Sequence, residues 1–300
     1  MSYLWGIDMG GTKIEGAILK KGEKLEVVER LRVPTEGSKG YDRIVSNVKK
    51  VVDQLKERTG LNPERIGIGT PGTMDPIIGS MKNCNSTALN GRPLLTDLED
   101  QLGIEVMMSN DANCFAVAEA NMGVVQEVIP SASNVFGVIM GTGVGGGIVI
   151  NGKVINGRQG IGGEWGHNFL DESGGPCYCG KSGCVETIIS GPSLERYYRE
   201  QSGQVKSLKH IVEDHRKRTD PIATQTIERL LHFFGKGLSC IINILDPDAI
   251  VIGGGVGNID ELYTVGVNEL KKHVFNHRMD TLILKPKLGD SAGVFGAALL

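Results

Sequence analysis

The sequence carries one strand–turn–strand unit twice, at residues 4–18 and again at 135–149. In each copy an apolar strand enters a glycine-rich turn and returns as a second apolar strand. Turns that lack side chains let backbone N–H groups approach a polyanion closely. We therefore expect two related lobes whose turns lie on opposite sides of a cleft and hold one phosphate chain between them.

Composition limits the classes of protein that this chain can belong to. It has 300 residues, 40% hydrophobic and 22% charged, which suits a globular protein with room for two domains. A net charge of -3 provides no broad positive field for nucleic acid. No apolar run approaches the ~18 residues of a membrane span, and the first residues lack targeting features. We expect a cytoplasmic protein with no nucleic-acid or membrane partner.

The spacing of apolar residues predicts alternating strands and helices. Helical spacing over 41–58 ends at Gly60. Further helices are expected at 112–120, 192–198, 206–215, 223–245 and 291–300, and buried strands at 66–69, 105–108 and 248–252. This alternation predicts an α/β fold. The repeat suggests a smaller domain, 1–115, joined by the C-terminal helix 290–300, and a larger one, 116–289.

Two segments imitate known phosphate motifs. Residues 141–146 match G-x-G-x-x-G, but that fingerprint needs a following helix and here a second strand follows. Residues 175–182 match the P-loop pattern, but polar residues precede them instead of a buried strand. We reject both interpretations. A single glycine-rich turn is more often a plain hairpin, and only the second copy favours phosphate binding.

A cysteine cluster predicts a metal site. Cys177, Cys179 and Cys184 lie on one glycine-rich loop, and His167 precedes them. Three thiolates and one imidazole form a closed tetrahedral zinc set. The alternative, buried thiols without metal, is disfavoured because thiols this close would be prone to oxidation. A structural Zn²⁺ would order the loop and fix the flanking carboxylates of Glu164 and Glu186.

Five motifs stand in the order seen in the ROK family (repressor, open reading frame, kinase), which this chain resembles. They are Asp8-x-Gly10-Gly11-Thr12, Asn110-Asp111-Ala112-Asn113, the glycine run 141–147, Gly163-Glu164-Trp165-Gly166-His167 and the cysteine motif 177–186. The resemblance implies an actin-like, hexokinase-like fold of two ribonuclease-H-like domains, with ATP and a sugar bound in the cleft.

Within that family the motifs most resemble bacterial fructokinases that also accept mannose. The matching stretches are 82–91, 163–168, 176–183, 243–248 and 289–291. The resemblance implies ATP-dependent phosphorylation of fructose, with mannose as a second substrate, at the C6 hydroxyl. Glucokinases and N-acetylhexosamine kinases share the core motifs, and modest changes in a pocket accept or exclude one substituent. Both remain alternatives.

The resemblance also implies roles for single residues. Asp111 would be the catalytic base, although it could be merely the N-cap of the following helix. Asp8 would act on Mg²⁺ through water, or could be only a turn cap. The expected sugar contacts are Asn85, Asn110, Glu164, His167 and Glu186. The expected nucleotide contacts are Asp8, Gly10, Gly11, Thr12, Lys13, Gly141, Thr142, Gly143, Gly254 and Gly255.

Two other classes of protein compete with the kinase. Regulators in the family sense sugars without catalysis, but they carry a DNA-binding region ahead of the first hairpin, which here starts at Leu4. An actin-like structural ATPase has no need of a zinc-ordered pair of carboxylates. We therefore expect a kinase whose partners are a small sugar and ATP, and a homodimer because dimers are common among ROK proteins.

Overall fold

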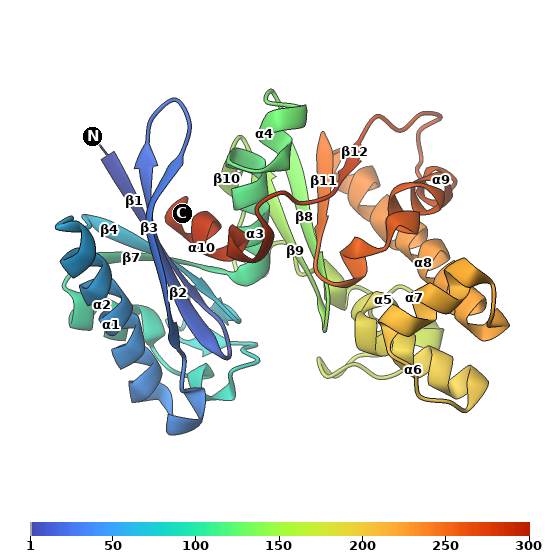
Figure 1. The fold of residues 1–300 in the computed structure, drawn as a ribbon, viewed down its shortest axis with the longest axis horizontal. Coiled ribbons are helices and arrows are strands. Elements are labelled where there is room, and N and C mark those ends of the chain that lie inside the picture. Colours follow the sequence, from blue (N-terminus) through green and yellow to red (C-terminus); the bar gives the residue numbers. More distant parts are fainter. Residues whose placement is uncertain (1) are drawn as a thin grey trace. The chain divides into compact units, whose positions relative to one another are not determined.

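The computed structural model describes residues 2–300, which pack into two compact units (Figure 1). The first unit contains residues 2–131, Gly147–Gly163 and Lys287–Leu300, and the second contains Ala132–Gly146 and Glu164–Pro286. This grouping by contacts differs from the division that the sequence suggested at residue 116. Helix α3 (Asp111–Asn121) packs against the C-terminal helix α10 (Ala292–Ala298), which keeps residues 116–131 in the first unit.

The first unit is built on a mixed five-stranded sheet with the order β3-β2-β1-β4-β7. Strands β1, β2 and β3 are antiparallel, while β4 and β7 run parallel to β1. The bounds are β1 (Ser2–Met9), β2 (Lys13–Lys21), β3 (Glu26–Pro34), β4 (Arg65–Thr70) and β7 (Glu105–Asn110). The carboxyl ends of β1, β4 and β7 thus lie at one edge of the sheet, where open α/β sheets bind ligands.

Helices cover both faces of this sheet, as Figure 1 shows for α1 (Tyr41–Thr59) and α10. Gly16 faces α1, where a Cβ atom would lie 2.3 Å from Val51, and Gly6 faces α10, where it would lie 2.2 Å from the carbonyl oxygen of Val294. Glycine is therefore required for the close approach of both helices. The unit also contains α2 (Leu94–Leu102), α4 (Val124–Val128), the small hairpin β5 (Thr73–Met74) and β6 (Met81–Lys82), and the short strand β10 (Lys153–Val154).

The second sheet has the order β10-β9-β8-β11-β12. Strand β11 is parallel to β8 and β12, and β10 is antiparallel to β9. The strands are β8 (Asn134–Met140), β9 (Val144–Ile150), β10 (Lys153–Val154), β11 (Ala249–Gly253) and β12 (Leu282–Leu284). The helices of the second unit are α5 (Glu186–Ile189), α6 (Gly191–Ser202), α7 (Leu208–Lys217), α8 (Pro221–Leu245) and α9 (Val265–Lys271). Short 3-10 turns lie at Gly37–Lys39, Thr87–Leu89, Trp165–His167, Glu172–Gly174, Val256–Asn258, Asp260–Tyr263 and Gly289–Ser291.

The structure confirms the α/β class, and it confirms that neither phosphate motif is genuine. After the turn at 141–143 the chain continues as strand β9, and the P-loop-like segment forms an irregular loop with a Pro176–Ser182 bridge. The main differences are at helix ends. Helix α8 begins at Pro221, earlier than expected, because the side chain of Asp220 caps the N–H groups of Ile222 and Ala223. Among residues 2–300, no helix has both the length and the apolar character needed to cross a bilayer.

Candidate active site

Asp111 lies where β7 ends and α3 begins, and it is not the cap of that helix. The N-cap is Asn110, whose Oδ1 accepts a hydrogen bond of 2.9 Å from the backbone N–H of Asn113. Asp111 Oδ1 accepts from the N–H of Ala112 at 2.7 Å. Burial raises the pKa of Asp111, while its backbone hydrogen bonds oppose that shift. The neighbouring residue therefore fills the structural role. The carboxylate of Asp111 is left uncommitted to capping, and partial desolvation by the surrounding protein increases its proton affinity although the residue is accessible to solvent.

Asp8 lies near the end of β1, where its surroundings disfavour the ionised carboxylate. Burial, followed by the negative charges of Asp111 and Glu15, raises the pKa of Asp8 to about 6. Two glycines make room for this carboxylate. A Cβ at Gly293 would lie 2.8 Å from Asp8 Oδ2, and one at Gly69 would lie 3.4 Å from Oδ1. Asp8 and Asp111 thus form a pair of mutually repelling carboxylates, which a hard cation such as Mg²⁺ would relieve.

The first glycine-rich turn, residues 10–13, is held closed by backbone contacts. The N–H of Gly10 donates to the carbonyl oxygen of Lys13 at 2.9 Å, and the hydroxyl of Thr35 donates to the carbonyl oxygen of Gly10 at 2.6 Å. Gly11 and Thr12 are exposed at its tip. Hydrogen bonds therefore close this turn and leave its tip accessible, and its contact with phosphate remains a prediction.

The second glycine-rich turn is braced by a carboxylate. Glu186 Oε2 accepts from the N–H of Val144 at 2.9 Å, and a Cβ at Gly143 would lie 2.5 Å from that oxygen. The N–H of Gly141 donates to the carbonyl oxygen of Gly143 at 2.9 Å. Glu186, expected from the sequence to bind sugar, thus has one oxygen committed to this turn. Thr142 lies at the turn between the two glycines.

Gly254 and Gly255 follow strand β11 and differ in their surroundings. Gly254 has φ +83 and passes so close to β8 that a Cβ would lie 2.2 Å from the carbonyl oxygen of Met140. A Cβ at Gly255 would meet nothing within 4 Å. Gly254 therefore serves backbone packing, and Gly255 borders open space of the kind expected beside a nucleoside.

The four expected metal ligands come together in the second unit. The ligand atoms of His167, Cys177, Cys179 and Cys184 all lie within 4.8 Å of one another. His167 Nδ1 is 3.6 Å from Cys177 Sγ, and the Sγ atoms of Cys179 and Cys184 are 3.6 Å apart. Zn–S bonds of ~2.3 Å in a tetrahedron require sulfur separations of about 3.8 Å. The donor set and its spacing therefore fit Zn²⁺.

The other nitrogen of His167 has a partner that the sequence did not reveal. His167 Nε2 lies 2.9 Å from the hydroxyl of Tyr178, inside the cysteine loop. The two rings meet edge to face with centroids 5.1 Å apart. Tyr178 thus orients the imidazole, and the expected contact of His167 with a sugar hydroxyl remains a prediction.

The remaining expected sugar contacts lie in two different units. Glu164 immediately precedes the 3-10 turn Trp165–His167 in the second unit, so its position is linked to that of the histidine. Asn85 lies on an exposed loop of the first unit, where its N–H donates to the carbonyl oxygen of Pro71 at 3.3 Å. Asn110 caps α3 in the same unit.

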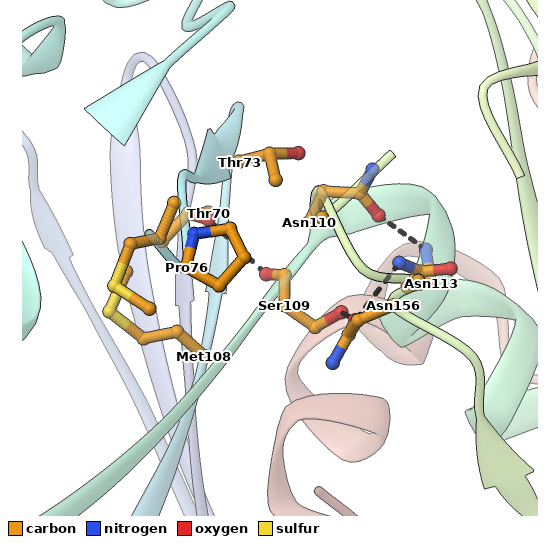
Figure 2. A pocket seen from close by; sticks show the side chains of 11 residues that line it. Thr70, Thr73, Pro76, Met108, Ser109, Asn110, Asn113 and Asn156 are labelled. Atoms are coloured by element: carbon orange, nitrogen blue, oxygen red, sulfur yellow. Dashed lines mark hydrogen bonds between the residues drawn. The ribbon is translucent and has the colours of Figure 1, made fainter. Parts of the chain in front are cut away.

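The sequence did not predict a cavity that lies beside Asn110. The cavity has a volume of about 100 Å³, and its walls include Thr73, Met74, Pro76, Met108, Ser109 and Asn156 (Figure 2). A usable signal was present, because the strands expected at 66–69 and 105–108 both run into polar residues. The structure pairs two of these, Thr70 and Asn110, across the parallel strands β4 and β7. Both residues end their strands, and ligands gather at such ends. Asn156 carried no signal, since the loop that presents it is far away in the sequence.

The comparisons with known proteins agree across the whole chain. The ROK family model matches residues 4–300. An N-acetyl-D-glucosamine kinase from Pasteurella multocida is 34% identical over 307 residues, which cover 99% of this chain and 98% of the relative. A ROK hexokinase from Thermus thermophilus is 29% identical, with a TM-score of 0.89 and coverage of 99% and 97%.

A ROK family glucokinase from Streptomyces griseus, solved with glucose and AMPPNP, is also 29% identical, with a TM-score of 0.76 and coverage of 99% and 98%. The two solved structures establish the fold of this chain as that of the ROK hexokinases and glucokinases, the actin-like fold expected above.

Proposed function

The chain belongs to the ROK family, and we propose that it is an ATP-dependent sugar kinase whose substrate is an N-acetylhexosamine, with N-acetyl-D-glucosamine as the leading candidate. The observation that carries the choice of sugar is the 34% identity, along almost the full length of both chains, to an N-acetyl-D-glucosamine kinase. The fructose specificity expected from the motifs has no support among these relatives. The N-acetylhexosamine alternative fits them better.

Asp111 is the residue that we assign as the base. Phosphoryl transfer depends mainly on positioning and on neutralising charge, and the base accepts the proton of the attacking hydroxyl. In this mechanism the carboxylate of Asp111 takes the proton of the sugar C6 hydroxyl as that oxygen attacks the γ-phosphorus of ATP. Because desolvation by the surrounding protein raises its pKa, Asp111 holds a proton more readily than an aspartate free in water does.

The turns at 10–13 and 141–143 would bind the phosphates of ATP, with Gly255 beside the nucleoside. Asp8 would bind Mg²⁺ through water, and the cation would supply charge neutralisation at the phosphates. Its pKa of about 6 leaves Asp8 ionised at neutral pH and available for that cation. Asn85, Asn110, Glu164, His167 and Glu186 are proposed to hold the sugar hydroxyls.

The zinc site is part of the proposal. His167, Cys177, Cys179 and Cys184 would hold a structural Zn²⁺, because the spacing of their ligand atoms suits tetrahedral coordination. With all four positions filled by protein, the metal has no open place for substrate. Its contribution would be to order the loop that presents Glu164 and Glu186.

The test is a coupled ADP-release assay of the purified protein with ATP, Mg²⁺ and a panel of sugars. The panel holds N-acetyl-D-glucosamine, N-acetylmannosamine, glucose, mannose and fructose. We expect the highest kcat/KM with an N-acetylhexosamine. Activity confined to fructose and mannose would restore the fructokinase prediction. No ADP release with any sugar would favour the non-catalytic regulator instead. The homodimer expected from the resemblance is tested separately by sedimentation equilibrium.

A further inference from the structure

The cavity beside Asn110 lies at the carboxyl ends of β4 and β7. Asn110 immediately precedes the proposed base, Asp111, in the sequence. The cavity is formed entirely within the first unit. Its volume of about 100 Å³ far exceeds the roughly 10–15 Å³ that one water needs. Asn110, a proposed sugar contact, lines the cavity, so a sugar bound by Asn110 would lie beside it. The cavity can therefore receive a small substituent of that sugar.

One wall of the cavity is apolar. It is formed by Met74, Pro76 and Met108. Figure 2 shows Pro76 and Met108 on the side away from Asn110 and Asn113. A hydroxyl group placed against these side chains would lose water without gaining a partner, which disfavours binding. A methyl group in the same place would bury apolar surface on both sides. This wall therefore favours a substituent that ends in an alkyl group.

The opposite wall is polar and its donors are arranged by internal hydrogen bonds. Asn156 Oδ1 accepts from the hydroxyl of Ser109 at 2.6 Å and from Asn113 Nδ2 at 3.3 Å (Figure 2). Two donors on one oxygen fix the orientation of this carboxamide and turn its Nδ2 away from both of them. Within residues 2–300, no group accepts a hydrogen bond from Asn156 Nδ2. This N–H group is therefore available to donate to a ligand.

We propose that this cavity binds the acetamido group of the sugar and thereby selects N-acetylhexosamines over plain hexoses. The acetamido group pairs a carbonyl acceptor with a terminal methyl, and the cavity pairs a polar wall with an apolar one. This inference rests on the proposed function and deepens it. Met108 and Asn156 are the residues that determine specificity.

The first experiment fills the cavity. Met108→Phe adds volume at the apolar wall, and the matched control is Met107→Phe on the same strand, whose side chain is 38% exposed and does not line the cavity. A group as small as one methylene changes discrimination by roughly 10–200-fold in a tight pocket. We expect Met108→Phe to lower kcat/KM for N-acetyl-D-glucosamine at least about tenfold more than for glucose. Met107→Phe should leave the ratio of the two unchanged.

The second experiment enlarges the cavity and does not depend on glucose as a substrate. Met108→Ala should shift the preference of the enzyme from N-acetyl- toward N-butyryl-glucosamine, since the longer acyl chain fills the space left by the missing side chain. Thermal melting of each variant, recorded without ligand, separates loss of fold from loss of specificity. Wild-type enzyme should prefer the N-acetyl sugar.

The outcomes distinguish this inference from the function on which it rests. If wild-type enzyme phosphorylates no acetamido sugar, the proposed substrate class is wrong and the inference falls with it. If wild-type enzyme does phosphorylate N-acetyl-D-glucosamine, but Met108→Phe lowers both sugars equally and Met108→Ala leaves the acyl-chain preference unchanged, only the cavity assignment is overturned.

Discussion

At the scale of single residues, the most informative arrangement is the division of labour at the start of α3. Asn110 caps the helix, and this leaves the carboxylate of Asp111 for the proton transfer proposed above. We predict that Asp111→Ala lowers kcat by about 10²–10⁴, the usual contribution of a positioned base. Steady-state kinetics with the preferred sugar measure this loss.

The fold should survive that substitution, because the cap is not touched. The melting temperature and the dissociation constant for the sugar should stay close to the wild-type values. Asn110→Ala is the contrasting variant, since removing a helix cap costs about 0.5–2 kcal/mol of stability. Near-normal turnover by Asp111→Ala would show that another group accepts the proton.

Asp8 makes stability depend on pH. Its folded pKa of about 6 lies above the unfolded value of 3.8, so the folded state holds the proton more tightly. The stabilising contribution is complete below pH ~4 and is lost as the pH rises through 6, in total about 3 kcal/mol at most. In the absence of Mg²⁺ and nucleotide, Asp8→Asn should therefore gain stability relative to wild type between pH 4 and 7. Urea denaturation at several pH values measures the difference.

The same pair offers an internal check. The charge of Asp111 is one cause of the raised pKa of Asp8. Asp111→Asn should therefore move the pH window of Asp8 downward in an otherwise wild-type chain. An unchanged stability difference between wild type and Asp8→Asn over pH 4–7 would mean that Asp8 is not perturbed in this way.

At the scale of elements, the cysteine loop brings the proposed zinc ligands together. Gly180 and Gly183 have positive φ of +85 and +74, which turns the chain so that the thiols meet. Cys179→Ser should reduce bound zinc from about one equivalent to far below it and weaken sugar binding, because the loop carries Glu186. Elemental analysis and isothermal titration measure the two effects.

The control variant is Cys240→Ser. Cys240 lies on α8 and is not among the four proposed ligands. This variant should retain full metal content and sugar affinity. A wild-type protein purified without any chelator and found free of zinc would remove the basis for the metal site.

Helix α10 packs so closely that single atoms decide its stability. A Cβ at Gly296 would lie 1.7 Å from the carbonyl oxygen of Cys114, on α3. Because that obstacle is backbone, Gly296→Ala must displace a helix, and we predict a loss of at least about 1–3 kcal/mol. Gly37→Ala is the matched control, since its Cβ would meet only side-chain atoms at 3.9 Å. Equal unfolding free energies of the two variants would contradict this packing.

At the scale of the whole molecule, the chain returns to its starting unit at the end. Residues Lys287–Leu300 complete the first unit, and the N–H groups of Lys287 and Leu288 donate to the buried Glu119 at 3.0 and 2.8 Å. Deleting 287–300 would expose the face of β1 and β4 and leave that carboxylate short of partners. We predict that the truncated chain loses cooperative thermal unfolding, which circular dichroism measures. We also predict that less of it stays in the soluble fraction.

A point substitution in α10 tests the same packing in case the truncated chain does not fold. Val294→Ala removes two buried methyl groups from α10 without removing the helix, and should lower stability by about 1–3 kcal/mol, twice the cost of a single buried methyl group. If the truncated chain melts as cooperatively as wild type, the last segment is not part of the first unit's core.

Features set by neighbouring residues were readable in advance. The apolar spacing of α1, the stop at Gly60 with φ +69, the two glycine-rich turns and the clustering of three cysteines all depend on residues a few positions apart. Backbone preferences and side-chain periodicity act over such distances, and they are legible in a linear sequence. The α/β class followed from them, and the motif order identified the family.

Features that depend on which distant segments meet were not readable. The sequence offered no reason to prefer Asn110 over Asp111 as the cap, to bring Asp8 into the field of Asp111, or to place Asn156 on a wall beside Ser109. The first unit draws on three separate stretches of chain, which a single boundary near residue 116 does not describe. Burial and packing act through space, and they raise a pKa or shape a cavity only after folding has brought such segments into contact.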